Sequence, residues 1–260
     1  MTDKLKTLIF DIETSPIIIP TFDLWGEKNG DHKAIIQDWF VISVAWKWLG
    51  EKKVDVVSVL DDEKRFNKNH TDDTHVIKTI HKVLSEADII VGHNVIKFDW
   101  KKLNTRFIKH GLDPIPKKRV ADTYRVAKRE FNFTSNRLDY IANYLGLGAK
   151  METPKGLWLD TLRGDVKALQ TMVKYNKQDV VITEKVYLAL RPYDTAPINL
   201  SSATEDMVCP KCGSKHFSPQ GHRYTSTGKF QQYKCKECKG WFSSKVNLLK
   251  QSTAVKVVSQ

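Results

Sequence analysis

The chain is organised around one short stretch, Leu8-Ile-Phe-Asp11-Ile-Glu13-Thr-Ser-Pro16. Its apolar start is typical of a β-strand, and residues two apart on a strand share one face, so the carboxylates of Asp11 and Glu13 are expected side by side. Like charges this close are unfavourable unless a cation neutralises them, which indicates a divalent metal with oxygen ligands. For an isolated pair of acids, a solvated strand-to-turn junction remains the alternative.

Length and composition favour one main domain plus a small module in the 260 residues, and a hydrophobic content of 41% is enough for a folded core. The formal charge of +12 favours a polyanionic partner such as nucleic acid, although basic proteins without one exist. No apolar run reaches the length of about 18 residues that a membrane span needs, and the start lacks a signal peptide. We therefore expect a cytoplasmic protein, in which clustered cysteines indicate metal rather than disulfides.

Strands and helices alternate in the later part of the chain. Strand-like runs are expected at residues 5–11, 40–48, 53–59, 89–91 and 119–122, and helices at residues 74–86, 100–108, 123–130, 136–145 and 161–190. Residues 50–53 suit a hairpin, residues 61–73 a surface loop, and residues 15–40 an irregular excursion with Phe22 and Trp25 as anchors. This order predicts an α/β sheet with helices packed against it.

Two further segments carry acids in settings that chemistry can use. Asp99 follows Gly92-His-Asn94 at the start of a helix, and we expect it, like Asp11, just past the end of a strand. Ligands of α/β sheets collect at the carboxyl ends of strands. Tyr175 and Asp179 lie four residues apart in the last long helix, so the hydroxyl and the carboxylate share one helical face.

Three motifs thus follow one another in order: Phe-Asp11-Ile-Glu13-Thr, then Gly-His-Asn94 with Phe-Asp99, then Tyr175-x-x-x-Asp179. This series resembles the exonuclease motifs of the DEDD superfamily, in the tyrosine subgroup that includes the proofreading domain of family B DNA polymerases. The resemblance covers about residues 5–190. It implies a ribonuclease H-like fold, a mixed sheet with helices on both faces, and hydrolysis of nucleic acid from its 3′ end.

The resemblance also implies a site with two Mg²⁺ or Mn²⁺ ions, which clamp the attacking and leaving oxygens of an in-line displacement. Asp11 would bridge the two ions, Glu13 and Asp179 would complete the first, and Asp99 would support the second. Glu13 and Tyr175 would orient the attacking water. For Tyr175 positioning is the better role, because an unshifted phenol titrates near ~10 and is a poor base at neutral pH. A packed helix tyrosine is the alternative for Tyr175.

Contacts to the substrate strand are implied for Thr14, Asn94 and Phe98. Asn94 and Phe98 could equally be a turn residue and a core residue. Asp122 precedes a helix, and we favour an N-cap over a fifth metal ligand at this position.

All four cysteines fall in the C-terminal part, as two C-x-x-C pairs separated by 22 residues. This pattern predicts one structural Zn²⁺ in a zinc ribbon, held by Cys209, Cys212, Cys235 and Cys238. A redox pair or unrelated thiols is the alternative. Residues 201–260 carry ten lysines or arginines against three acids. Such a basic ribbon with interleaved aromatics suits phosphate contact and base stacking, with Lys234 and Trp241 as candidates, although Tyr233 and Phe242 suit the core of the module.

We therefore expect an exonuclease domain at residues 1–192, a linker at 193–206, a zinc ribbon at 207–246 and a basic tail at 247–260. The expected activity is metal-dependent 3′→5′ hydrolysis of single-stranded or frayed DNA, with a replication or repair protein as a possible further partner. A role in a phage or mobile element is equally compatible with the composition. An exoribonuclease, or a silent adaptor that binds nucleic acid through the ribbon, is the alternative.

Overall fold

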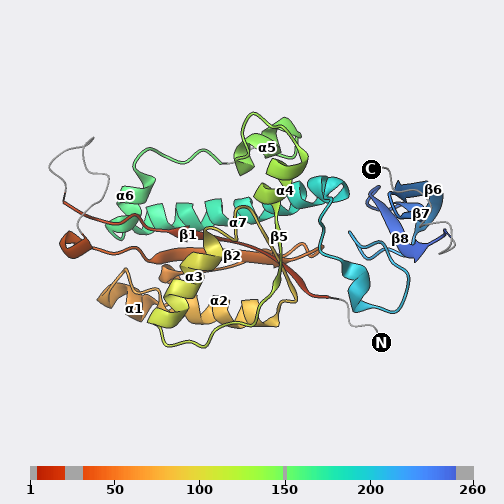
Figure 1. Cartoon of the computed structure of the whole chain (residues 1–260). Coiled ribbons are helices and arrows are strands. Elements are labelled where there is room, and N and C mark those ends of the chain that lie inside the picture. The colour runs from red at the N-terminus through yellow and green to blue at the C-terminus, as the bar shows by residue number, and fades with distance from the viewer. Residues whose placement is uncertain (1–4, 21–31, 149–150, 250–260) are drawn as a thin grey trace. The chain divides into compact units, whose positions relative to one another are not determined.

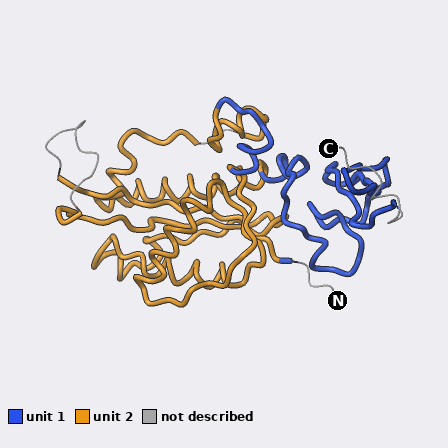
Figure 2. Tube along the Cα trace, in the orientation of Figure 1, with its two compact units in different colours: residues 1–5, 125–134, 187–260 blue, residues 6–124, 135–186 orange. Residues whose placement is uncertain are grey.

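The computed structural model describes residues 5–20, 32–148 and 151–249. The expected anchors Phe22 and Trp25, and nearly all of the expected basic tail, lie outside these residues. The chain divides into two compact units (Figure 2): residues 6–124 and 135–186 form one, and residues 1–5, 125–134 and 187–260 form the other. Among the described residues, no helix has the length and apolar character needed to cross a membrane.

A five-stranded sheet forms the centre of the first unit, in the order β3-β2-β1-β4-β5. Its strands are β1 (Thr7–Thr14), β2 (Val41–Trp48), β3 (Asp55–Ser58), β4 (Ile89–Gly92) and β5 (Arg119–Asp122). Strand β1 pairs antiparallel with β2 and parallel with β4, so the sheet is mixed, as the sequence predicted.

Helices cover both faces of this sheet (Figure 1), with α2 (Thr74–Glu86) and α3 (Asp99–Lys109) on one side and α7 (Val166–Leu190) on the other. The remaining α-helices are α1 (Glu63–Lys68), α4 (Thr123–Glu130), α5 (Leu138–Tyr144) and α6 (Leu157–Leu162). Alternation along β1 explains the layering: Leu8, Phe10 and Ile12 are buried in one apolar cluster with Ile77 and Ile80 of α2. The residues between them face α7.

Three local expectations were wrong. Strand β1 continues to Thr14 instead of ending at Asp11, because the pairing with β2 continues through Glu13. The expected loop at 61–73 contains helix α1, which buries no side chain and so has no apolar periodicity to detect; the Asp62 carboxylate caps it. The expected helix at 161–190 divides at Gly164, whose φ of 76° ends α6 before α7 begins.

The second unit contains a three-stranded antiparallel sheet, β6 (Phe217–Thr225), β7 (Gly228–Cys235) and β8 (Trp241–Asn247). Tyr233 and Phe242 pack as core residues here: their rings stack with centroids 5.4 Å apart, and Phe217 lies edge-on to both. The buried apolar cluster of this small module consists of Cys209, Cys235 and Cys238, with Cys212 and Phe242 packed against it.

Hydrogen bonds within the second unit hold the first residues of the expected linker in place. The Asp194 carboxylate accepts hydrogen bonds from the Arg129 guanidinium and, at 2.9 Å, from the Ala196 amide. Thr195 donates its amide to Glu130 over 2.9 Å. Two short 3₁₀ turns, Arg191–Tyr193 and Leu200–Ala203, also fall in or beside this segment. The expected domain boundaries stay a prediction.

Central strand β4 provides a test of this core. Ile90 is fully buried, whereas Ile108 on α3 is 79% exposed. Ile90→Ala should lower the free energy of unfolding by roughly 2–5 kcal/mol, because it leaves a cavity that the packed neighbours cannot close. The matched Ile108→Ala should cost less than about 0.5 kcal/mol. Urea unfolding of both variants measures the difference, and equal losses would contradict this arrangement of the sheet.

Candidate functional site

Strand β1 presents its two acids on the face toward α7. Asp11 pairs with Ala45 and Glu13 with Ser43 on β2, so both acids lie inside the strand. The expectation that Asp11 lies just past the end of the strand was wrong. Ser43 Oγ donates to the side chain of Asn176 on α7 over 3.1 Å, which places this face of the sheet against that helix. The strand geometry therefore brings the two carboxylates together as the sequence predicted.

Helix α7 adds a third acid to this pair. Carboxylate oxygens of Asp11, Glu13 and Asp179 all lie within 4.8 Å of one another, and Asp179 is only 4% exposed. Three acids at this separation are the donor set of a hard divalent cation. The residues present thus fit a magnesium- or manganese-type site.

An open cleft of about 430 Å³ lies over this cluster. Four of the predicted site residues line it: Asp11, Asn94, Tyr175 and Asp179. Tyr175 also packs against the apolar core at its ring, so its hydroxyl and its ring have different surroundings. The i, i+4 spacing on α7 thus directs the tyrosine and Asp179 into one cleft.

Asn176 is a site residue that the sequence analysis missed. It is fully buried, and its Nδ2 donates to Asp11 at both the side-chain Oδ2 (2.8 Å) and the backbone carbonyl (3.1 Å). Ser43 donates to Asn176 Oδ1 and so fixes the orientation of the amide. Asn176 lies three residues before Asp179, so helical spacing from that acid was the signal that could have found it.

Asp99 lies next to the cluster but is turned inward. Its Oδ1 accepts a hydrogen bond from the Ile12 amide at 3.2 Å, and only 3% of the residue is exposed. Burial, together with the charge of Asp122, raises the pKa of Asp99 to about 7 in the metal-free protein. The structure thus attaches Asp99 to the backbone between Asp11 and Glu13, outside the three-carboxylate group.

Asp122 acts as a cap for two backbone segments. It accepts from the Tyr124 amide at 3.1 Å, at the start of α4, and from the amides of Asn94 (2.9 Å) and Ile96 (3.3 Å). Asn94 has a φ of 62°, a left-handed conformation that asparagine tolerates better than most residues. Asp122 therefore holds the turn that brings Asn94 to the cleft, in keeping with the capping role favoured above.

The cleft is also lined by six residues that were not predicted as site residues: His93, Tyr124, Asn136, Arg137, Leu138 and Asp139. His93 Nε2 donates to the Asn136 carbonyl over 2.9 Å, and its Nδ1 lies 2.9 Å from the Thr123 hydroxyl. The histidine thus joins the turn after β4 to the segment before α5.

The two remaining predicted strand contacts, Thr14 and Phe98, are not among the residues that line the cleft. Thr14 ends β1 at a bulge opposite Val41, and Phe98, which precedes α3, is 42% exposed. Such exposure argues against a core role for Phe98.

The four cysteines form a second site. Their sulfurs lie within 4.8 Å of one another, with Cys209–Cys238 at 3.7 Å and Cys212–Cys235 at 3.6 Å. These distances are far too long for a disulfide, but they match the edge of a tetrahedron of sulfurs about 2.3 Å from a central Zn²⁺. A hydrogen bond from Cys209 lowers the pKa of Cys212, which favours the thiolate form that binds metal.

The predicted nucleic-acid contacts of the ribbon are neighbours on paired strands. Lys234 of β7 pairs with Trp241 of β8, and the lysine Nζ lies 5.6 Å from the centre of the indole ring. Trp241 is 43% exposed. The pair therefore offers a cation and an aromatic surface together.

A mixed sheet with clustered carboxylates facing a long helix is the arrangement of a ribonuclease H-like fold. Residues 40–191 match the RNase_H superfamily over more than half of the chain, and the chain belongs to that superfamily. A stretch of 150 residues is 28% identical to a DNA polymerase III PolC-type from Ureaplasma parvum serovar 3, covering 54% of this chain and 10% of that polymerase. The chain thus spans about a tenth of that relative's length.

Among solved structures, the family B DNA polymerase from the hyperthermophilic archaeon Pyrobaculum calidifontis matches with a TM-score of 0.52 and 18% identity. The match covers 85% of this chain and 31% of that polymerase. Together, the superfamily match and this structural likeness confirm the predicted ribonuclease H-like fold and the predicted resemblance to a family B DNA polymerase.

The inward position of Asp99 leads to a test in protein free of divalent cations. The unfolded chain loses this proton near pH ~4, whereas the folded protein keeps it to about pH 7. Stability from this group is therefore complete below pH ~4 and is lost as pH rises through ~7. The Asp99→Asn side chain cannot ionise. The free energy of unfolding of this variant, relative to that of the wild type, should therefore be higher at pH ~8 than at pH ~5, by on the order of 1–4 kcal/mol.

Urea unfolding of wild type and variant at the two pH values measures this difference. Asp160→Asn, at an exposed position on α6, is the matched control and should show the same stability difference at both. A pH-independent effect of Asp99→Asn would contradict the raised pKa.

Proposed function

We propose that this protein is a metal-dependent 3′→5′ exonuclease that removes nucleotides from single-stranded or frayed DNA. The observation that carries the proposal is the set of three carboxylates within 4.8 Å, from β1 and α7, at a cleft that Tyr175 and Asn94 also line. The superfamily match and the relationship to DNA polymerases support the same class of reaction.

Asp11, Glu13 and Asp179 would hold the divalent cations, and Asp99 would support the second of them. When bound, such cations supply Lewis-acid stabilisation of the attacking and leaving oxygens of the phosphodiester. The amide of Asn176 keeps the Asp11 carboxylate in one orientation. The hydroxyl of Tyr175 would accept a hydrogen bond from the attacking water or donate one to it, and would so fix the direction of attack. Phenols ionise too weakly at neutral pH for a role as free base.

Thr14, Asn94 and Phe98 would contact the terminal nucleotides of the strand. The net charge of +12 suits a polyanionic substrate. An exoribonuclease is the second candidate within the same chemistry, because no residue singled out above reads a 2′-hydroxyl.

The ribbon would contribute binding rather than catalysis. Four cysteines fill all positions of a tetrahedral zinc, which leaves no open site for substrate. The Lys234–Trp241 pair would contact phosphate and base, or the ribbon would bind a replication or repair protein. A silent adaptor acting through the ribbon is the candidate from another class, but clustered carboxylates only oppose polyanion binding unless a cation fills the cluster.

The nuclease activity is tested with 5′-labelled and 3′-labelled single-stranded DNA and RNA oligonucleotides, with Mg²⁺, Mn²⁺ or no divalent cation. We expect a metal-dependent ladder that shortens from the 3′ end, faster on DNA. Asp11→Asn should lower the rate by roughly a thousandfold or more, because it removes a charge shared by the whole donor set.

Asp160→Asn serves as control and should change the rate less than about twofold. Absence of cleavage with either metal, combined with tight binding that survives Asp11→Asn, would reject the nuclease and favour the adaptor.

The zinc assignment has its own test. Purified protein should contain about one zinc per chain by mass spectrometry of the metals, and Cys238→Ser should lose most of it because three thiolates bind far more weakly than four. His216→Ala is the control, since His216 is a potential ligand within the ribbon but contacts Glu237 instead. Zinc retained by Cys238→Ser but lost from His216→Ala would contradict the four-cysteine site.

A further inference from the structure

Two aromatic residues flank the end of β1 that carries the acids. Trp39 immediately precedes the first pair between β1 and β2, where Phe40 and Ser15 exchange hydrogen bonds of 3.0 Å. Phe98 immediately precedes Asp99, which binds the backbone of Ile12. Both aromatics therefore lie near the end of β1 that carries Asp11 and Glu13.

The ammonium of Lys102 lies against both rings. Its Nζ is 3.8 Å from the centre of the Trp39 ring and 5.5 Å from that of Phe98. Among the described residues, none forms a hydrogen bond or an ion pair with this ammonium. Burial lowers its pKa, the charge of Asp38 partly opposes this decrease, and the charge of Arg106 adds to it. Contacts with two rings orient the cation without neutralising it.

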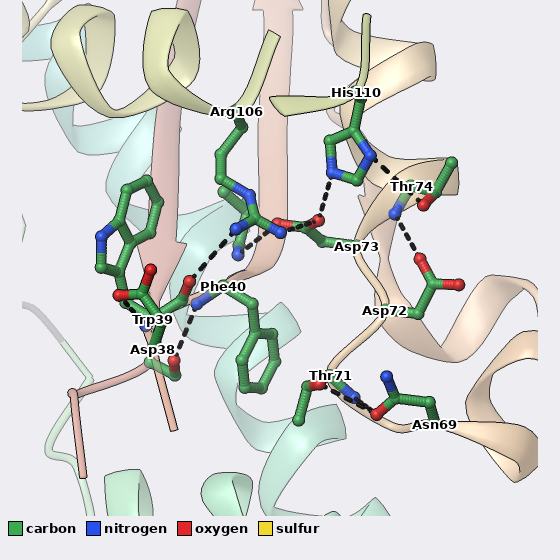
Figure 3. Close-up of polar contacts among 12 residues, drawn as sticks. Asp38, Trp39, Phe40, Asn69, Thr71, Asp72, Asp73, Thr74, Arg106 and His110 are labelled. Carbon is green, nitrogen blue, oxygen red and sulfur yellow. Dashed lines mark hydrogen bonds and ion pairs between the residues drawn. The ribbon is translucent and has the colours of Figure 1, made fainter. Parts of the chain in front are cut away.

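A buried ion pair fixes Trp39 in place (Figure 3). Arg106, one turn after Lys102 on α3, donates to the Trp39 carbonyl at 3.3 Å and lies 5.4 Å from the indole ring. The same guanidinium binds the fully buried carboxylate of Asp73. Asp73 also accepts from the Val41 amide at 2.9 Å and from His110 Nε2 at 2.8 Å.

Such a pair contributes little net stability, because burying two charges costs about as much as their attraction returns. Its effect here is geometric: it joins the N-terminus of α2, the middle of α3 and the start of β2. The position of Trp39, and with it that of Lys102, is thereby set by the core and not by the surface.

We propose that Lys102 binds a backbone phosphate of the substrate strand upstream of the scissile bond, next to the strand contact already proposed for Phe98. An oriented, unneutralised cation next to an exposed aromatic ring is the combination that binds single-stranded nucleic acid. This inference rests on the proposed function for the direction of the strand. It adds Lys102 and Trp39, which the motif analysis did not single out, to the substrate path.

The test compares Lys102→Met with Lys101→Met, a change at the exposed neighbouring lysine. Binding of a labelled single-stranded 15-nucleotide DNA is measured without divalent cations at several salt concentrations. Lys102→Met should weaken binding about 5- to 10-fold at low salt and reduce the slope of log affinity against log salt by about 1, because one phosphate contact is lost. Lys101→Met should change the affinity less than about twofold, and Lys102→Arg should restore most of it.

A second readout is the dependence of kcat/KM on substrate length. The preference of the wild type for the 15-mer over a dinucleotide should shrink in Lys102→Met, an effect that a general loss of folding would not produce. If Lys102→Met and Lys101→Met bind with the same affinity and salt slope, the inference is overturned even if the enzyme cleaves normally. Lys102-dependent binding without any cleavage by the wild type would support the inference and reject the nuclease.

Discussion

Repulsion among the carboxylates of Asp11, Glu13 and Asp179 is the constraint that the surrounding structure has to balance. With oxygens within 4.8 Å, each charge opposes the ionisation of the others. The Asn176 amide offsets part of this by binding one oxygen of Asp11, and Ser43 holds the amide in that orientation. A divalent cation would offset the remainder. Backbone pairing of β1 with β2 and the packing of α7 on the sheet keep the acids together until it binds.

The sequence predicted what local patterns determine. Apolar periodicity located α2, α4 and β5 at their observed residues, and the i, i+2 and i, i+4 spacings located Asp11, Glu13, Tyr175 and Asp179. Features that depend on packing between distant segments could not be predicted from the sequence. Asn176 matters only because α7 crosses the face of β1, and the inward turn of Asp99 depends on where α3 begins relative to Ile12. Helix α1 was missed for a different reason: it buries no residue, so its sequence has no apolar face to recognise.

The two units solve the problem of clustered anionic ligands in different ways. In the first unit, the oxygen donors lie at an open cleft, where a weakly held, exchangeable cation and a substrate could meet. In the ribbon, three of the four cysteines are buried and Phe242 packs against them. A metal held there would take the place of the hydrophobic core that so few residues cannot build. Chelators of different strength should therefore act on the two sites separately.

Strand β1 has the core on one face and the reactive acids on the other, and the side-chain period of a strand is two. A slip of one residue in its pairing would drive Asp11 and Glu13 into the apolar layer against α2 and turn Leu8, Phe10 and Ile12 toward the cleft. A chain with this wrong register would not form a stable fold, because burying two unpaired carboxylates would unfold it. Errors of assembly would then reach cellular quality control as unfolded protein, and folded molecules would all carry the acids on the correct face.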